Sequence, residues 1–301
     1  MLLSCTATIG KVSINKVELT TNQQINAIVC NSRIIPEYLA IYLKTQKENL
    51  ENLTSNSGVK HINQQMLNNF KIPLPSKNIQ DRIVDEIKKL EQEENKIQKE
   101  FKNLKISISR LLPKNNNLEK VENIVSLLKR GKSPQYGNSK IQIIKSGQAR
   151  GYKKFDFSEK HFADEKFVLD ERKLQKGDIL INSTGVGTAG RITMFDLEGD
   201  YVVDSHITIL RLDRTKALPD YILYYFCDLG FKTIEAMALG QSGQIELSLE
   251  TIKNIKIPLP VILEQHKIVA KIEKIEKQRD LLKSNIQEIS KQKEEVLKKY
   301  L

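Results

Sequence analysis

A glycine-rich stretch at residues 185–190 is the part of this sequence closest to a nucleotide-binding motif. It resembles a phosphate-binding loop, but Arg191 and Ile192 stand where such a loop needs a lysine for the phosphates and a hydroxyl for magnesium. Without those two groups the loop lacks its chemistry. We therefore expect a tight turn here rather than a nucleotide site.

The four histidines offer no metal-binding or acid-base pairing, because they are scattered at His61, His161, His206 and His266. The sequence also has no Gly-x-Ser-x-Gly nucleophile elbow and no Asp/Asn-Pro-Pro-Tyr/Phe tetrapeptide of the kind amino-methyltransferases use. We expect each histidine to be structural or at the surface. The chain is expected to hold no catalytic residue, no metal and no cofactor.

Positive charge is the more informative chemistry, because the chain carries a net charge of +11. Residues 123–155 contain no acidic side chain, and eight basic residues fall among them: Lys129, Arg130, Lys132, Lys140, Lys145, Arg150, Lys153 and Lys154. Such a run neutralises DNA phosphates, and the Gln, Asn, Ser and Tyr side chains interleaved with it can read base edges. The alternative is a solvated surface of strands and loops.

We expect the DNA contacts in two stretches of this basic window, with further contacts from Arg191 and from the glycine-rich loop near residue 242. The alternative for Arg191 is a turn residue that pairs with the phosphate backbone. The candidate DNA-binding residues are Lys129, Arg130, Lys132, Ser133, Tyr136, Ser146, Gln148, Arg150, Tyr152, Lys153, Arg191, Gln241, Ser242 and Gln244.

An internal repeat shows which elements must position these residues. One repeated segment is Ile35-Pro-Glu-Tyr-Leu39, which corresponds to Leu218-Pro-Asp-Tyr-Ile222. Each is predicted to begin a helix, with proline near its first turn. The segment Lys-Ile-Pro-Leu-Pro recurs 185 positions further on, at residues 71–75 and 256–260, and Gln80 answers Gln265 at the same offset. Residues 118–177 have no counterpart before Met1, so the first copy is expected to be partial.

Local patterns predict an α+β fold for each copy, built on an irregular, mostly antiparallel sheet. Strands are predicted at residues 141–144, 178–181 and 206–212, and a helix from 219 to about 227. The two Lys-Ile-Pro-Leu-Pro segments are also expected to be strand-like.

Two long helices follow the repeated segments, because apolar residues alternate at spacings of four and three, the pattern of a coiled coil. A charged residue replaces the apolar one at Glu94 in the first helix, and at Arg279 and Lys293 in the second. The seam consists of Ile83, Ile87, Leu90, Ile97, Phe101 and Leu104 in the first helix, and Ile272, Ile275, Leu282, Ile286, Ile289 and Val296 in the second.

Two antiparallel registers of these helices leave Glu94 beside an opposite charge. In one register Lys293 lies one layer from Glu94, and in the other, shifted by a heptad, Arg279 lies next to it. We expect these charges to select the register at some cost in stability. Replacing Glu94 alone with leucine is then expected to stabilise the coil.

Length and composition fit a two-domain cytoplasmic protein, with 301 residues of which 40% are hydrophobic. Cys5, Cys30 and Cys227 form neither a disulfide framework nor a zinc-binding pattern. No apolar run approaches the roughly 18 residues of a membrane span.

The repeated modules, each ending in a proline-rich segment and a heptad helix, resemble the specificity (S) subunit of type I restriction-modification systems. The resemblance spans the whole chain. It is carried by residues 127–134, 177–182, 187–192 and 243–260 with Glu264 and Gln265 in the second copy, and by residues 7–12 and 58–75 in the first.

The resemblance implies a protein that selects a DNA sequence and catalyses nothing. Each target-recognition domain would read half of a bipartite double-stranded DNA site, and the antiparallel helices would separate the two domains and dock two methyltransferase (M) subunits, which restriction (R) subunits join. The first helix spans about 42 Å from Ile83 to Leu111, or about 12 base pairs. The implied domains are residues 1–77 (partial first target-recognition domain), 78–112 (first helix), 113–262 (complete second domain) and 263–301 (second helix).

The partial first domain leaves three interpretations open. The chain is a silent or partial cassette, a fragment completed by a second specificity chain, or a reduced subunit with one DNA reader. A coiled-coil scaffold that binds proteins is the alternative from a different functional class.

Overall fold

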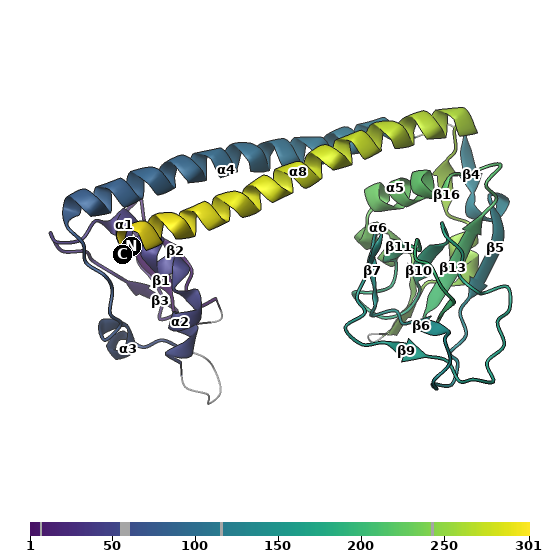
Figure 1. Ribbon diagram of the computed structural model, residues 1–301, viewed down its shortest axis with the longest axis horizontal. Coiled ribbons are helices and arrows are strands. Elements are labelled where there is room, and N and C mark those ends of the chain that lie inside the picture. The colour runs from purple at the N-terminus through teal and green to yellow at the C-terminus, as the bar shows by residue number, and fades with distance from the viewer. Residues whose placement is uncertain (7, 55–60, 115–116, 242–243) are drawn as a thin grey trace. The chain divides into compact units, whose positions relative to one another are not determined.

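The computed structural model describes residues 1–6, 8–54, 61–114, 117–241 and 244–301 (Figure 1). The chain forms two compact units, one of Met1–Leu104 with Gln278–Leu301 and one of Lys105–Lys277. Ser242 and the repeated glycines Gly58 and Gly243 lie outside the described residues. No helix in the described ranges is long and apolar enough to cross a membrane.

The second unit is built on a four-stranded sheet in which every neighbouring pair is antiparallel. Its order is β11 (Ile192–Met194), β10 (Ile179–Asn182), β13 (Ile207–Leu212) and β5 (Val125–Arg130). A second sheet has the order β12 (Tyr201–Val203), β6 (Gln142–Ile144) and β9 (His161–Phe162), and only its β12–β6 pair is parallel. The predicted α+β fold with mostly antiparallel sheets is confirmed.

Three two-stranded ladders complete the strands of this unit. They are β4 (Leu118–Lys120) with β16 (Lys256–Pro258), β7 (Ala149–Gly151) with β8 (Lys154–Phe155), and β14 (Leu239–Gln241) with β15 (Gln244–Glu246). β4 leads through the short helix η1 (Val121–Asn123) into β5.

Helix α5 (Pro219–Leu229) covers the four-stranded sheet because one of its faces is apolar. Pro219 starts the helix and Asp220 supplies an acidic first turn, while Tyr221, Ile222 and Phe226 are buried against the strands. Shorter helices α6 (Phe231–Glu235) and α7 (Leu249–Lys253) follow. On the other face of the sheet, a second core joins it to β6 and β12.

The first unit repeats the centre of this architecture. Its sheet has the order β2 (Val12–Ser13), β1 (Leu2–Ser4) and β3 (Ile25–Ala27), matching β11, β10 and β13, and helices α1 (Pro36–Thr45), α2 (Lys47–Asn52) and α3 (Gln64–Asn68) follow. Individual hydrogen bonds recur as well. Cys5 N donates to Gln24 O as Ser183 N donates to His206 O, and Ile62 N donates to Cys5 O as Leu247 N donates to Ser183 O.

A fully buried glutamine closes the same junction in both units. Gln265 accepts from Leu218 N and donates to Lys216 O and Pro260 O at 2.8–2.9 Å. Gln80 makes the equivalent three bonds, to Ile35 N, Arg33 O and Pro75 O. This glutamine ties the start of each long helix to the proline-rich segment and to the start of the helix on the sheet.

The two proline-rich segments differ, which corrects one expectation. Lys256–Pro258 forms strand β16 by pairing with β4, whereas residues 71–75 have no regular structure. The described part of the first unit holds no counterpart of β4, so the segment has no strand with which to pair.

The long helices α4 (Lys77–Leu111) and α8 (Ile262–Tyr300) are antiparallel, as predicted. In the first unit, Ile83, Val84 and Ile87 of α4 form a core with Val296 and Leu297 of α8. In the second unit, Ile108 and Leu111 of α4, with Leu112 directly after it, pack in one core with Ile268, Val269 and Ile272 of α8. All twelve predicted seam residues are buried or half-buried.

The register is the one that brings Lys293 to Glu94, with 2.5 Å between Nζ and Oε2. The alternative, with Arg279 beside Glu94, is wrong, because the Arg279 guanidinium lies over the Phe101 ring, 4.7 Å from its centroid. The pair of Lys293 and Glu94 is about three-quarters buried. The position of Arg279 over the face of Phe101 is a cation–π contact, which accommodates this second charged residue in the seam.

Candidate nucleic-acid interface

The ends of four strands of the second unit converge at one end of the sheets, which we call the loop end. It comprises residues 131–136 after β5, residues 145–147 after β6, residues 183–187 after β10 and residues 204–206 before β13. The opposite ends of β5 and β13 lie at the helices, where Asp213 N donates to Ile124 O. Strand pairing brings these loops together, because β5 and β10 both pair with β13, and β6 pairs with β12, the strand before residues 204–206.

Hydrogen bonds between the loops hold the loop end together. Ser133 Oγ lies 2.9 Å from Ser205 Oγ, Asn182 Nδ2 donates to Ser146 O at 2.8 Å, and Thr184 Oγ1 lies 2.7 Å from His206 Nδ1. Each bond joins a different pair of loops, so the polar groups form one connected surface.

Asp204 is the buried anchor of this surface. Its carboxylate accepts hydrogen bonds from Ser146 N at 3.3 Å and His206 N at 2.9 Å. Burial raises the pKa of Asp204, against the opposing effect of these two bonds. Gly131 packs against the same turn, since a Cβ at residue 131 would lie 2.2 Å from Asp204 O. The turn between β12 and β13 is therefore fixed in place.

Exposed groups suited to DNA project from this anchored frame. Tyr136 is 62% exposed, stacks on His161 with 5.4 Å between ring centroids, and has Lys145 Nζ 5.6 Å from its own centroid. Ser133 and His206 are also exposed. A lysine, an aromatic ring and hydroxyls on one surface combine phosphate contact with groups that can reach base edges.

Five of the eight cations in the basic window form ion pairs with acidic residues from outside it. Lys129 pairs with Glu171, Arg130 with Glu246, Lys132 with Asp170, Arg150 with Asp156, and Lys153 with Asp220. The charge count of the window therefore overstates its free positive charge.

Three of the acidic partners have lowered pKa values. The hydrogen bond from Lys129 lowers the pKa of Glu171, and that from Arg150 lowers the pKa of Asp156 to about 2. Burial raises the pKa of Asp170, but bonds from Arg172 N and Lys132 outweigh it and lower the pKa to about 2. Solvent screens exposed pairs of this kind and makes each of them weak, so a phosphate can replace the carboxylate.

Three candidate residues have their side chains engaged inside the unit instead. Gln148 is buried, accepting from Lys145 N and donating to Glu159 O. Tyr152, at a positive φ of 59°, donates its hydroxyl to Glu276 of α8, and Lys153 bonds Asp220 of α5 at 2.7 Å. These contacts give Gln148, Tyr152 and Lys153 structural roles within the unit, and their contact with DNA stays a prediction.

The glycine-rich stretch forms a tight turn, as expected. Gly185, Gly187 and Gly190 have positive φ, and Gly187 N donates to Glu235 Oε1 at 2.6 Å, so a carboxylate of the chain itself occupies this backbone donor. Arg191 donates to Gly187 O and Ala149 O at 3.2–3.4 Å. Arg191 thus has the geometry of the turn residue that was its alternative interpretation.

The β14–β15 hairpin contacts the loop end through its second strand. Gly185 N donates to Ile245 O at 3.1 Å, and Arg130 bonds both Glu246 at 2.7 Å and Leu247 O at 3.2 Å. Gln241 and Gln244 are paired backbone positions in this hairpin.

Sequence reasoning missed Thr184, Ser205 and His206 as members of the surface. His206 had no partner within the sequence pattern, and its relation to Thr184 arises only from the pairing of β10 with β13. The one available signal was the position of residues 204–206 directly before a predicted strand.

The sheets and the paired long helices define an α+β module with a polar loop end. A family model described as type I restriction modification DNA specificity domain matches residues 1–107 and 113–291. The chain therefore belongs to the type I restriction modification DNA specificity domain family.

Two curated relatives agree with this family. A putative type I restriction enzyme specificity subunit of Haemophilus influenzae is 33% identical over 144 residues, which cover 46% of this chain and 35% of that protein. The type I restriction enzyme MjaVIII specificity subunit of Methanocaldococcus jannaschii is 20% identical over 96% of this chain and 74% of its own length. The match thus spans about a third of the Haemophilus protein.

Solved structures share the fold at low sequence identity. The HsdS subunit of Thermoanaerobacter tengcongensis has a TM-score of 0.51 and 17% identity, over 88% of this chain and 69% of that one. The S subunit of M. genitalium has a TM-score of 0.53 and 16% identity, over 100% and 82%. A chain from a structure of type I restriction-modification complex assembly has a TM-score of 0.61 and 15% identity, over 99% and 80%.

Proposed function

We propose that this chain is a non-catalytic specificity subunit whose second unit reads one half of a bipartite double-stranded DNA site through the loop end. The observation that carries the proposal is the connected surface of Ser133, Tyr136, Lys145 and His206, built on the anchored Asp204 turn. Hydrogen bonds hold its frame together, and its groups include the half-buried Lys145, which forms no ion pair among the described residues.

We further propose that the paired helices α4 and α8 dock two methyltransferase subunits, and that restriction subunits join through these. Membership in the specificity family supports this, as does an antiparallel coil whose outer faces are charged and exposed. Because its partners are DNA and DNA-modifying enzymes, we place the protein in the cytoplasm.

The test is to purify the chain with its methyltransferase partner, select bound duplexes from a random DNA library, and measure affinity for the selected duplex against salt. The chain is expected to select one half-site. Lys145→Ala should weaken binding to selected and random duplexes alike, and lower the slope of log affinity against log salt by about 0.9, the value for one lost phosphate contact. Tyr136→Ala should weaken the selected duplex about tenfold more than the random one.

Lys256→Ala is the matched control, because Lys256 is an exposed lysine on β16, at the end of the unit opposite the loop end. This variant should leave unchanged the ratio of the affinity for the selected duplex to that for the random duplex. If all three variants behave alike, the loop end is not the reader.

A protein-binding scaffold remains the competing function, and the pairing of five window cations with carboxylates favours it. Selection of no sequence, together with retained binding of the methyltransferase, would establish the scaffold or the silent cassette instead. Selection of a complete bipartite site by the chain would show that the first unit also reads DNA.

A further inference from the structure

The second unit shows what covers the outer edge of the repeated sheet. β5 pairs with β13 along its length, from Thr208 opposite Arg130 to Leu212 opposite Val125. Before β5, β4 pairs with β16. Residues of this β4–η1–β5 segment then enter the main core, which contains Val121 and Ile124 with Val125 and Leu128 packed against it.

The apolar partners of that segment belong to α5, α7 and the residues leading into β16. They are Ile222, Phe226, Ile252, Ile255 and Ile257, all buried in the same core. The repeat places Leu39, Leu43, Leu67, Phe70 and Ile72 at these five positions in the first unit.

In the first unit these equivalent residues line an open hollow instead of a filled core. The hollow has a volume of about 490 Å³ and is bounded by Leu39, Leu43, Leu67, Phe70 and Ile72 together with residues 26–29 of the β3 edge. The β4–η1–β5 segment fills the corresponding space in the second unit. The hollow therefore has the lining of a core that lacks one segment.

The backbone of β3 is also ready to accept a strand. Ile28 N donates to Met1 O and Ile28 O accepts from the Met1 amino group, so Ile28 faces β1. By the alternation of antiparallel pairing, the N–H and C=O groups of Ala27 and Val29 point to the other side. β3 is the last strand of its described sheet, and the Val29 side chain is 94% exposed.

A second hollow of the first unit corresponds to the place of the β7–β8 hairpin. In the second unit Tyr152 N donates to Ile192 O, and Met194 N donates to Tyr152 O, along the edge strand β11. The equivalent strand β2, with Val12 and Ser13, lines an open hollow of about 620 Å³.

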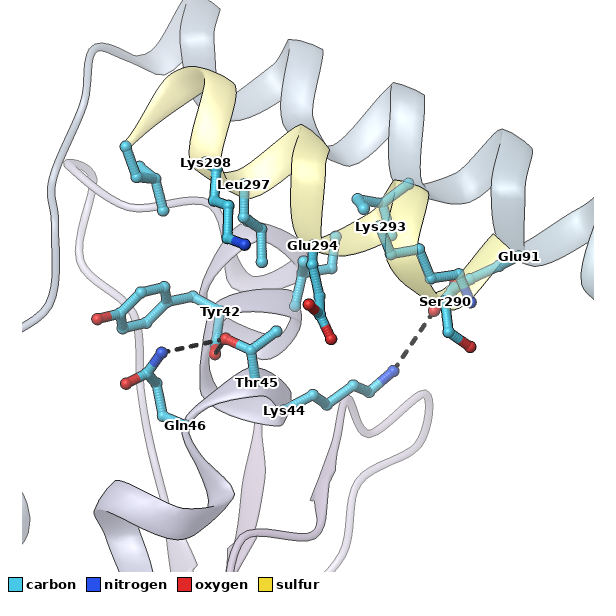
Figure 2. Close-up of a pocket in the computed structure, with 13 residues that line it drawn as sticks. Tyr42, Lys44, Thr45, Gln46, Glu91, Ser290, Lys293, Glu294, Leu297 and Lys298 are labelled. Carbon is cyan, nitrogen blue, oxygen red and sulfur yellow. Dashed lines mark hydrogen bonds and ion pairs between the residues drawn. The ribbon is translucent and has the colours of Figure 1, made fainter. Parts of the chain in front are cut away.

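A third hollow of the first unit is the groove between α1 and the long helices (Figure 2). In the second unit, Glu276 accepts hydrogen bonds from both Tyr152 and Tyr224. The repeat places Glu91 at the position of Glu276. Among the described residues Glu91 forms an ion pair with Lys44, at 3.6 Å, at the margin of a groove of about 750 Å³. Thus all three hollows lie where residues 118–177 pack in the second unit.

We propose that this face of the first unit is a docking surface for a segment of the β4–η1–β5 kind, which the chain binds when the segment is supplied as a separate polypeptide. A β5-type strand adds to the Ala27–Val29 edge, a β4-type strand pairs with residues 71–73, and apolar side chains between them fill the 490 Å³ hollow. The inference deepens the proposed function by naming a partner, but it needs no DNA.

The probe is a labelled synthetic peptide with the sequence of residues 117–131 of this chain, added to the full-length protein without DNA. Saturable binding in fluorescence anisotropy is expected, with new protection of the Ala27 and Val29 amides in hydrogen exchange. A peptide carrying Val121→Asp, Ile124→Asp and Leu128→Asp is the matched control and should bind at least about tenfold more weakly, because its apolar side chains cannot fill the hollow.

Ala27→Pro in the protein locates the site. Proline removes only an outward-facing N–H, so the fold, checked by circular dichroism, should persist while peptide binding falls at least about tenfold. Absence of saturable binding overturns the proposal, and so does binding that Ala27→Pro leaves unchanged, which would place the peptide in the second unit.

A second copy of this chain is the competing occupant. In that case the protein alone is a dimer by light scattering, and the peptide binds only as the dimer dissociates, which would also overturn the proposal. Loss of DNA selection with peptide binding retained would refute the DNA-reading function but not this docking surface.

Discussion

The ion pair between Glu94 and Lys293 allows a quantitative test of how the coil is held in register. The two side chains are 22% and 25% exposed, so they lie between an exposed pair, worth about 0–1 kcal/mol, and a buried one, whose disruption from one side costs about 3–5 kcal/mol. Glu94→Leu alone leaves the Lys293 ammonium in a mostly apolar seam. We expect it to lower the free energy of unfolding by about 1–2 kcal/mol.

The sequence alone predicted that Glu94→Leu would stabilise the coil. Because Lys293 contacts Glu94 directly, we now expect the same substitution to destabilise it. Lys293→Leu should cost less, because Glu94 keeps the hydrogen bond from Gln98 Nε2 at 3.0 Å. The double variant Glu94→Leu with Lys293→Leu replaces the pair by apolar contact and should be more stable than wild type by about 1–3 kcal/mol.

Urea unfolding followed by circular dichroism at 222 nm provides the measurement, since the chain has no tryptophan for fluorescence. The control is Lys44→Met, which breaks the exposed pair with Glu91 and should change stability by less than about 0.5 kcal/mol. A Glu94→Leu protein more stable than wild type, or additive single substitutions, would refute the reasoning.

Three further outcomes are expected. Gln265→Leu, and equally Gln80→Leu, should lower the free energy of unfolding by about 3 kcal/mol in urea titrations, because each removes three hydrogen bonds made by a buried glutamine. Tyr152→Phe should cost about 1–2 kcal/mol by losing its bond to Glu276 while leaving DNA affinity unchanged in anisotropy, and a selective loss of DNA affinity would place Tyr152 among the DNA contacts. The pKa of Asp170 is lowered to about 2 in the folded chain, so its contribution to folding stability is present above its ordinary pKa near 4 and is lost as pH falls toward 2. Asp170→Asn should therefore weaken the dependence of the urea midpoint on pH between about 4 and 2.

Much of the scaffold was predictable because its signals are local and periodic. The seam rhythm predicted α4 and α8, and proline and acidic residues at Pro219 and Asp220 predicted the start of α5. The internal repeat was a further signal. Gln80 and Gln265 stand at the same offset in the two copies, which indicated a shared role that their equivalent hydrogen bonds bear out.

The candidate site was less predictable because its members come from loops far apart in the sequence. Ser133 and Tyr136 keep the exposed positions expected of them, and Ser146 lies in the loop end beside them. Gln148 and Tyr152 have residue types equally suited to base reading and to packing. Their side chains lie inside the unit because β7 runs along β11 and brings residue 152 to α8.

The sequence by itself determined the repeat, the helical seam and the family, since each is written in residue types at fixed spacing. Tertiary structure alone decided which cations of the basic window are paired, because Glu171 lies 42 residues from Lys129 and Glu246 lies 116 from Arg130. It also selected between the two registers, since both satisfy the heptads and only side-chain packing distinguishes Lys293 from Arg279 as the neighbour of Glu94.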